Sequence, residues 1–361
     1  MRLLQSDKLI EEFFEPASQS LQKGSHPQGE VAGKIYFEYA SFCAAQLEDQ
    51  HTIADIKRME NLHRTKANEV QQYTETMKMA KERGDQFAFK RLYRDHERAT
   101  KLQKMDKEEL QRLHALQRTF LRKAVENFLK CFAASDEFDH HVPKFCAIWL
   151  KHAKQKGLHD IVFSNLPNVP SYKFLHLLHQ LCSRLSDEKD DDFQQNLIVL
   201  LGRVLGEHPF HSSHQIFSAI FGSGEVLAAS RASAASKLAN RASRKYENSH
   251  SSNPNLFASL FDLYSAYSDL ANLPLDKKSH AGAKLAFSAY PGLRLFHSKG
   301  IVGLHLPPPS LKLPISLDLD YSNVPYISKF DQSFKIAGGI NQPKILDSSL
   351  SNGKQFRELV Y

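Results

Sequence analysis

Apolar residues recur at three- and four-residue spacings through most of the chain, which is the spacing that places them on one face of a helix. Residues 35–47 and residues 110–128 show this pattern most clearly. Proline breaks helices, and none occurs between Pro27 and Pro143. The sequence therefore predicts long helices in this region.

The proline-free region also contains signals for helix ends. Residues 55–104 are rich in charge and are expected to be helical, with a break near Gly84. Asp106 is followed three residues later by Glu109, which is the pattern of a capping box. A new helix is therefore predicted to begin at Asp106.

Shorter apolar stripes follow along the chain. Proline and glycine mark their limits, because Pro170 and Pro209 precede or open two of them and Gly206 ends another. The predicted helices cover residues 146–154, 171–185, 193–205, 209–221 and 256–273. Successive helices joined by short loops indicate an α-solenoid-like array of antiparallel helices.

The hydrophobic period changes to two towards the C-terminal end. Residues 311–319 place leucine or isoleucine at every second position, which predicts a half-buried strand, and Pro314 indicates an edge. Asn352-Gly353 is a strong hairpin turn signal. Further strands are expected at residues 326–330, 334–337, 343–347 and 354–360. The predicted fold class is therefore mainly α, with a small antiparallel β-sheet behind the helices.

Composition and charge narrow the class of protein. The 361 residues are 42% hydrophobic and 24% charged, as in folded domains. The formal net charge of +7 permits a nucleic-acid or phosphate partner, although a solvated basic surface is the commoner cause. The longest nearly unbroken apolar run, residues 197–201, is far shorter than the roughly 20 residues that span a bilayer. No membrane partner is expected.

The cysteines and the N-terminus indicate the compartment. No apolar segment follows Met1, so no signal peptide is expected. The four cysteines form no Cys-x-x-Cys pair and lie among apolar neighbours; they are Cys43, Cys131, Cys146 and Cys182. This is typical of buried free thiols in a reducing compartment, the cytoplasm or nucleus.

Two clusters raise the question of metal binding. His208, His211 and His214 are three residues apart, but no cysteine or carboxylate pair lies nearby in sequence to complete a tetrahedral set. Exposed imidazoles at a helix start are the favoured interpretation. The acidic run at residues 190–192 lacks the ligand spacing of a calcium loop and reads as a solvated loop. No metal site is predicted.

Two further features bear on phosphate binding. A basic set between residues 231 and 245 could contact a phosphate backbone, or could be a solvated helix or loop, which leaves direct nucleic-acid binding open. Its members are Arg231, Lys237, Arg241, Arg244 and Lys245. Gly338-Gly339 joins two predicted strands, where glycines would let a backbone approach a ligand, although an ordinary turn is the default.

Longer stretches carry a resemblance to one protein family. Residues 334–347, followed by Ser351-Asn-Gly-Lys354 and Arg357-Glu-Leu-Val360, resemble the start of the kinase domain in ATM-type phosphatidylinositol-3-kinase-related protein kinases. Residues 120–129, 145–150, 169–174 and 208–211 are similar, in the same order, to the C-terminal part of the FAT domain in that family. Residues 307–327 resemble the strand before the kinase loop, particularly in fungal-type telomere-maintenance relatives.

The resemblance implies a domain organisation. Residues 1–222 would be the C-terminal part of the FAT domain, and residues 223–328 a helical and irregular connection that ends in a β-strand. Residues 329–361 would be the truncated start of the catalytic domain, an incomplete kinase N-lobe.

The resemblance also implies a function. Members are nuclear serine/threonine kinases of DNA double-strand-break signalling and telomere maintenance. They transfer the γ-phosphate of ATP, with Mg²⁺, to Ser or Thr followed by Gln. A partner complex recruits them to breaks, and they form homodimers when full length.

In this chain the resemblance assigns five residues to the near wall of an ATP pocket: Gly338, Gly339, Asn341, Pro343 and Leu359. The family's ATP-binding lysine would follow the segment like residues 358–360, where this chain has Tyr361, and the catalytic and metal-binding aspartates lie further on. The 361 residues alone are therefore expected to have no catalytic residue, no cofactor and no kinase activity. The alternative is a stand-alone helical scaffold or protein-interaction module.

Overall fold

The computed structural model describes residues 7–23, 28–188, 191–221, 228–249, 255–274, 282–297, 301, 303–338 and 342–361. The chain is mainly α-helical and carries a small antiparallel sheet, which confirms the predicted fold class. It forms two compact units, Met1–Pro170 and Ser171–Tyr361. This division by packing differs from the three domains expected from the sequence, whose boundaries stay a prediction.

The first unit is entirely helical in its described part. Its helices are η1 (Ile10–Phe14), α2 (Glu15–Lys23), α3 (Glu30–Glu48), α4 (Gln50–Glu82), α5 (Gln86–Ala134), η2 (Asp139–His141), α6 (Val142–Lys151), α7 (Leu158–Asn165) and η3 (Leu166–Asn168). The predicted helix at residues 35–47 lies within α3.

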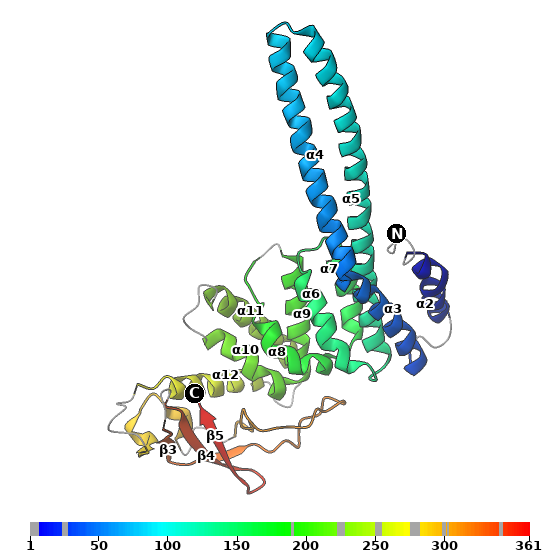
Figure 1. The fold of residues 1–361 in the computed structure, drawn as a ribbon. Coiled ribbons are helices and arrows are strands. Elements are labelled where there is room, and N and C mark those ends of the chain that lie inside the picture. The colour runs from blue at the N-terminus through cyan, green and yellow to red at the C-terminus, as the bar shows by residue number, and fades with distance from the viewer. Residues whose placement is uncertain are drawn as a thin grey trace. The chain divides into compact units, whose positions relative to one another are not determined.

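A long hairpin of α4 and α5 dominates this unit (Figure 1). Asp49 caps α4 by accepting a hydrogen bond from the Thr52 backbone N–H at 2.9 Å, and Asp85 caps α5 in the same way through Ala88. Gly84 lies between the helices with φ of +73°, a conformation that glycine adopts without strain. The predicted break near Gly84 is confirmed.

The predicted helix start at Asp106 is wrong. Asp106 lies in the middle of α5, which runs without interruption from Gln86 to Ala134. No proline or glycine interrupts these residues, and an aspartate in the interior of a helix costs only about 0.7 kcal/mol relative to alanine. A capping-box pattern therefore does not break a helix by itself.

The core of the first unit forms where α3 crosses the C-terminal half of α5. Small buried side chains on α3, such as Ala40 and Cys43, face the large ones on α5, such as Phe120 and Phe128. Gly33 marks the closest approach, because a Cβ atom at this position would lie 2.6 Å from Cβ of Ser135. Close contact between these helices therefore depends on small residues.

The second unit begins with helices and ends with the sheet. Its helices are η4 (Ser171–Leu177), α8 (Leu178–Cys182), α9 (Asp192–Glu207), α10 (Pro209–Phe221), α11 (Ala228–Ser249), α12 (Leu256–Ala271), η5 (Phe287–Ala289) and η6 (Arg294–Phe296). The predicted helix at 209–221 is confirmed. The predicted helix at 171–185 is instead a 3₁₀ segment followed by the short α8, although its apolar stripe is buried as expected. Gly206 does not end α9, which continues to Glu207.

The sheet is built around β4. Its strands are β1 (Lys284–Ala286), β2 (Ile327–Phe330), β3 (Ser333–Ile336), β4 (Lys344–Leu350) and β5 (Gln355–Val360), and every pairing is antiparallel. One edge of β4 pairs with β5, while β3 and β2 share the other edge. Four of the predicted strands are therefore confirmed.

The predicted strand at residues 311–319 is wrong. These residues form no strand, and Leu317 is 73% exposed rather than half-buried. Pro314 has no backbone N–H to donate to a partner strand. The segment instead lies along α10, where Leu313 C=O contacts the ring Nε2 of His211 at 3.2 Å.

All four cysteines are buried and none forms a disulfide. Burial raises the pKa of the Cys146 and Cys182 thiols to about 12, so both are held protonated at neutral pH. Within the described residues, no helix has the length and apolar character to cross a membrane.

The close approach at Gly33 can be tested by adding one methyl group. Gly33→Ala should lower the free energy of unfolding by about 1–3 kcal/mol, because the new Cβ overlaps Ser135. Gly202→Ala is the matched control on α9, where nothing lies within 4 Å of an added Cβ, and should raise stability by up to about 1 kcal/mol. Urea unfolding followed by circular dichroism measures both. Equal stabilisation by the two substitutions would contradict the close approach.

Candidate nucleotide-binding loop and sheet

The sheet has one buried and one open face. Residues paired across antiparallel strands point to the same side, so the register assigns each side chain to a face. Phe334, Ile336, Leu346 and Val360 lie on the buried face. Lys335, Ile345, Asp347, Arg357 and Leu359 lie on the open face.

An aromatic cluster covers the buried face. Phe287 stacks on Phe296 with ring centroids 5.1 Å apart and contacts Phe334 at the same distance. Phe296 contacts Phe330 edge-on at 4.9 Å. Such pairs add roughly 0.5–1.5 kcal/mol each to area burial, so this face is firmly held.

Glu358 anchors β5 from the buried face. Only 4% of this residue is exposed, and its carboxylate accepts hydrogen bonds from the Ser310 backbone N–H at 3.1 Å and the Ser310 hydroxyl at 2.8 Å. The hydroxyl of Tyr267 on α12 donates a third bond. Desolvation raises the pKa of Tyr267 well above its ordinary value, with the Glu358 charge as the next cause, so the hydroxyl stays a donor. Glu358 thus joins β5, α12 and the segment after the proline run.

Lys344 anchors β4 to the same helix. Its Nζ donates a hydrogen bond to the carbonyl of Ala271, the last residue of α12, where the helix dipole favours a cation. Burial lowers the pKa of Lys344. The start of β4, and with it the end of the preceding loop, is therefore fixed on α12.

The loop between β3 and β4 carries four of the five predicted ATP-wall residues. Gly338 is exposed with open space around it, and Pro343 is buried. The backbone N–H of Ala337 donates to the carbonyl of Pro343 at 2.8 Å, which closes the base of the loop. Gly339 and Asn341 lie outside the described residues.

Leu359, the fifth predicted residue, lies on β5 next to this loop. It is directly opposite Ile345 on β4, which in turn is opposite Lys335 on β3. These three side chains form a row on the open face, and Leu359 is 53% exposed. A flat apolar surface with a cation beside a glycine loop suits a planar ring attached to phosphates.

Lys335 and Ile345 were missed by the reasoning from sequence. Strand alternation alone places Ile345 two residues from Pro343, but its position opposite Leu359 depends on the register, which the loop length between β4 and β5 sets. The Asn352-Gly353 turn, in which Gly353 has φ of +80°, was the signal that could have fixed it.

The three histidines at the start of α10, of which His208 directly precedes the helix, have different surroundings. His208 is 1% exposed, and its Nδ1 lies 2.6 Å from the hydroxyl of Tyr321. His211 is half-buried and His214 exposed, so exposed imidazoles are confirmed only for His214. Burial lowers the pKa of His208 and His211. Among the described residues, no group of three or more His, Cys, Asp or Glu side chains is arranged to hold a metal.

Some residues in and near the acidic run and the basic set make structural contacts. Asp191 caps α9 by accepting from the Phe193 backbone N–H, and Asp190 lies outside the described residues. Asp187 binds Lys237 Nζ at 2.5 Å and accepts from the Ser233 hydroxyl. The basic set lies on α11, where Arg241, Arg244 and Lys245 are exposed, so the helical interpretation is confirmed and a disordered loop is excluded.

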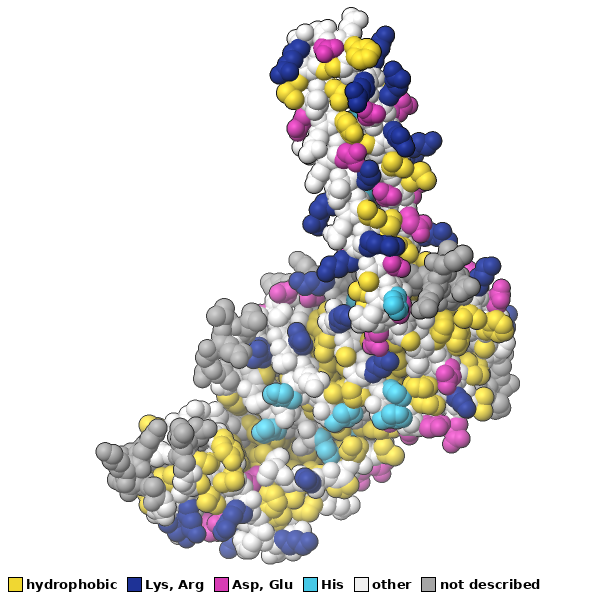
Figure 2. Space-filling view, in the orientation of Figure 1, with side chains coloured by type: hydrophobic (Ala, Val, Ile, Leu, Met, Phe, Trp, Pro, Cys, Tyr) yellow, Lys and Arg dark blue, Asp and Glu magenta, His cyan; other side chains and the backbone are white. Residues whose placement is uncertain are grey.

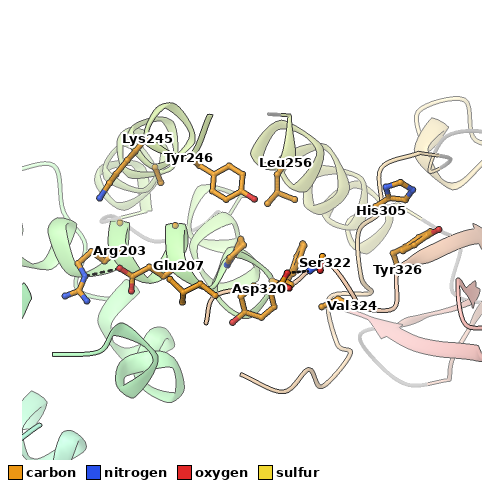
Figure 3. A pocket seen from close by; sticks show the side chains of 17 residues that line it. Arg203, Glu207, Lys245, Tyr246, Leu256, His305, Asp320, Ser322, Val324 and Tyr326 are labelled. Carbon is orange, nitrogen blue, oxygen red and sulfur yellow. Dashed lines mark hydrogen bonds and ion pairs between the residues drawn. The ribbon is translucent and has the colours of Figure 1, made fainter. Parts of the chain in front are cut away.

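A cavity of about 580 Å³ lies between α9, α11 and the segment around Tyr321 (Figure 3). Gly202 and Gly206 lie one turn apart on its α9 wall and leave room there. Tyr246 and Leu256 point into it, and Arg203 pairs with Glu207 at its edge. Of these two glycines, Gly206 was interpreted from the sequence only as a helix end, and no prediction was made for Gly202.

Known proteins resemble this chain over nearly its whole length. The serine/threonine-protein kinase tel1 of Emericella nidulans is 35% identical over 99% of the chain, and that of Schizosaccharomyces pombe is 30% identical over 96%. The serine-protein kinase ATM of Sus scrofa is 27% identical over 71%. The chain spans 12% of the length of each tel1 relative and 9% of ATM. No family model matches it.

Solved structures agree with the sequence relatives. The structure titled "FAT and kinase domain of CtTel1" has a TM-score of 0.80 and 29% identity, and covers 98% of this chain and 23% of its own. "Complete CtTel1 dimer with C2 symmetry" has the same TM-score and identity, with 12% of its own chain covered.

The anchor at Glu358 can be tested by truncation. Glu358→Ala leaves the Tyr267 hydroxyl and the Ser310 donors without their acceptor in a buried site, and should lower the free energy of unfolding by about 2–4 kcal/mol. Asp347→Ala on the open face removes an exposed pair with Arg357, and should cost under about 1 kcal/mol. Urea unfolding measures both. Similar losses for the two would show that Glu358 is not an anchor.

Burial of His208 predicts a pH dependence of stability. The unfolded chain binds a proton at this histidine below a pH of about 6.5, whereas the lowered pKa keeps the folded imidazole neutral to a lower pH. The stability that the buried, neutral His208 contributes is therefore full above pH 6.5. It is lost as the pH falls from there through the pKa of His208 in the folded chain. His208→Gln should make the urea midpoint fall less between pH 7 and pH 5.5 than it does in the parent chain. An unchanged pH profile would contradict the burial of a neutral His208.

Proposed function

The chain belongs to the family of Tel1 and ATM serine/threonine protein kinases, and we propose that its enzyme transfers the γ-phosphate of ATP to Ser or Thr followed by Gln. The observation that carries the proposal is the row Lys335–Ile345–Leu359 on the open face, beside the loop of Gly338 and Pro343. Similarity to tel1 kinases over 99% of the chain supports it.

In this proposal the open face is the near wall of the ATP pocket. Leu359 and Ile345 pack against the adenine, and the phosphates lie beside the loop, where glycine at positions 338 and 339 would permit close approach of the backbone. Lys335 lies on the same face as the apolar pair and favours the negative phosphates. Pro343 and Lys344 hold the loop base in place through Ala337 and Ala271.

Phosphoryl transfer needs more than this wall. Such transfer depends on positioning the substrate and on neutralising charge with Mg²⁺ and a lysine. In the family that residues 334–360 resemble, the groups that hold Mg²⁺ and accept the substrate proton lie further along the chain. We therefore propose that the 361 residues by themselves bind the near side of ATP at most and transfer no phosphate.

The cellular role proposed is the one that the resemblance to this kinase family implies. It comprises signalling of DNA double-strand breaks and telomere maintenance in the nucleus, with recruitment by a partner complex. A homodimer is proposed because a related solved structure is described as a dimer with C2 symmetry.

The wall can be tested in the full-length enzyme. Leu359→Glu should raise the KM for ATP about tenfold, because it replaces an apolar contact of about 1.5 kcal/mol with a charge that repels phosphates. Leu317→Glu is the matched control, since Leu317 is 73% exposed and lies off the sheet. ATP titrations with a Ser-Gln peptide measure both.

Three outcomes would contradict the proposal. If Leu359→Glu leaves the KM for ATP unchanged while activity is normal, Leu359 does not line the pocket. If the purified 361-residue chain phosphorylates a Ser-Gln peptide in Mg²⁺-ATP, the assignment of the remaining catalytic groups is wrong. If the full-length protein is inactive on every such peptide, the scaffold alternative is favoured.

A further inference from the structure

A cavity of about 610 Å³ in the first unit is lined by four basic side chains and no acidic one. Arg118 and Arg122 come from α5, and Lys154 and Lys156 from the turn between α6 and α7. Ala115, Thr119 and Gln155 complete the wall. We call this the cationic cavity; nothing in the proposed kinase function uses it.

Local geometry brings these charges together. Arg118 and Arg122 are four residues apart on a helix, so both point to the same side. Gly157 ends the turn with φ of +78° and directs the chain back along α5. A Cβ atom at Gly157 would lie 3.9 Å from Nη1 of Arg122, which shows how closely the turn approaches the arginine.

The four cations have no countercharge in the described structure. None of them forms an ion pair or a side-chain hydrogen bond with a described residue, and all four are exposed. Other cations of this unit are paired, such as Lys123 with Glu15 and Lys130 with Glu126. Figure 2 shows Lys and Arg interspersed with Asp and Glu along the α4–α5 hairpin. The cationic cavity departs from that mixture.

Two further features favour the binding of an anion at the cationic cavity. Arg118 and Arg122 repel each other, as like charges at this helical spacing do. The N-terminus of α7 begins at Leu158, directly after this turn, and no side chain caps it. The Leu158 N–H donates to the Gln155 carbonyl at 3.3 Å, and the other first-turn N–H groups add partial positive charge, which Asp160 in the same turn offsets in part. A bound anion would relieve both effects.

We propose that the cationic cavity binds a small ligand that carries more than one phosphate group. Arginine forks match phosphate oxygens with two parallel hydrogen bonds, and lysines add point charges. Four cations exceed the charge of a single phosphate monoester. Glu126 and Asp160 line a neighbouring cavity that shares Thr119 and Arg122, and these carboxylates limit the site on that side. A compact polyphosphate therefore fits better than an extended polyanion.

The test is binding of inorganic tripolyphosphate to the 361-residue chain by isothermal titration calorimetry at low salt. Arg118→Gln with Arg122→Gln should weaken binding at least about tenfold, because two charge-assisted contacts are lost. Lys154→Gln with Lys156→Gln should also weaken it. Binding should weaken as salt is raised, since the site is exposed.

Arg94→Gln with Arg98→Gln is the matched control. These arginines lie on the same helix, have the same spacing and are exposed, but line none of the cavities described above. The control should bind tripolyphosphate as the parent does, and circular dichroism should show equal helix content in all variants.

Three results would overturn the proposal. The first is no tripolyphosphate binding below millimolar concentration by the parent chain. The second is an equal loss in the control, which would mean diffuse attraction to a basic protein. The third is that a short single-stranded DNA or a doubly phosphorylated peptide binds more tightly than tripolyphosphate and that substitution of the same four residues abolishes this binding. That result would assign the site to a macromolecule. A loss confined to the cavity variants, with tripolyphosphate the tightest ligand, supports a small polyphosphate.

Discussion

The buried carboxylate of Glu358 is the contact on which the orientation of the sheet depends. It binds Tyr267 of α12 and Ser310 of the preceding segment, both more than 45 residues away in sequence. Because side chains alternate along a strand, a buried Glu358 places Leu359 on the opposite, open face. A slip of one residue in β5 would exchange the two faces and bury Leu359. The polar anchor therefore decides which side of the sheet is available to a ligand.

Local patterns predicted most elements of this fold, and non-local contacts explain the failures. Helix α10 was predicted at its observed limits because proline opens it and its apolar stripe has a clear period. Residues 311–319 have an equally clear period of two but form no strand, since no neighbouring strand pairs with them. Asp106 shows the converse, because a good local cap signal is overridden by strong helix formers on both sides. Periodicity predicts the possible element, and a partner decides whether it forms.

The candidate site divides in the same way. Gly338, Pro343 and Leu359 were selected through a family resemblance, and the structure brings the loop and β5 together through β4. The roles of Lys335 and Ile345 depend on register across three strands, which sequence spacing does not define. The contact of His208 with Tyr321 joins residues 113 apart, so the spacing of the three histidines alone favoured exposed imidazoles and no metal site. That spacing could not predict that His208 is buried beside a tyrosine from a distant part of the chain.

Unpaired like charges recur at the two places where we assign phosphate ligands. On the open face, Lys284 and Lys335 are directly opposite each other across β1 and β3, an arrangement that destabilises a sheet. At the cationic cavity, Arg118 and Arg122 repel each other along one helix face. Neither pair has a carboxylate partner among the described residues, whereas Arg357 on the same sheet face is neutralised by Asp347. Positive charge alone is common on this basic chain, so the informative feature is positive charge without a countercharge. A polyphosphate would supply that countercharge at both places. The two places differ in their apolar surroundings, because the sheet offers an apolar surface for a ring and the cationic cavity does not.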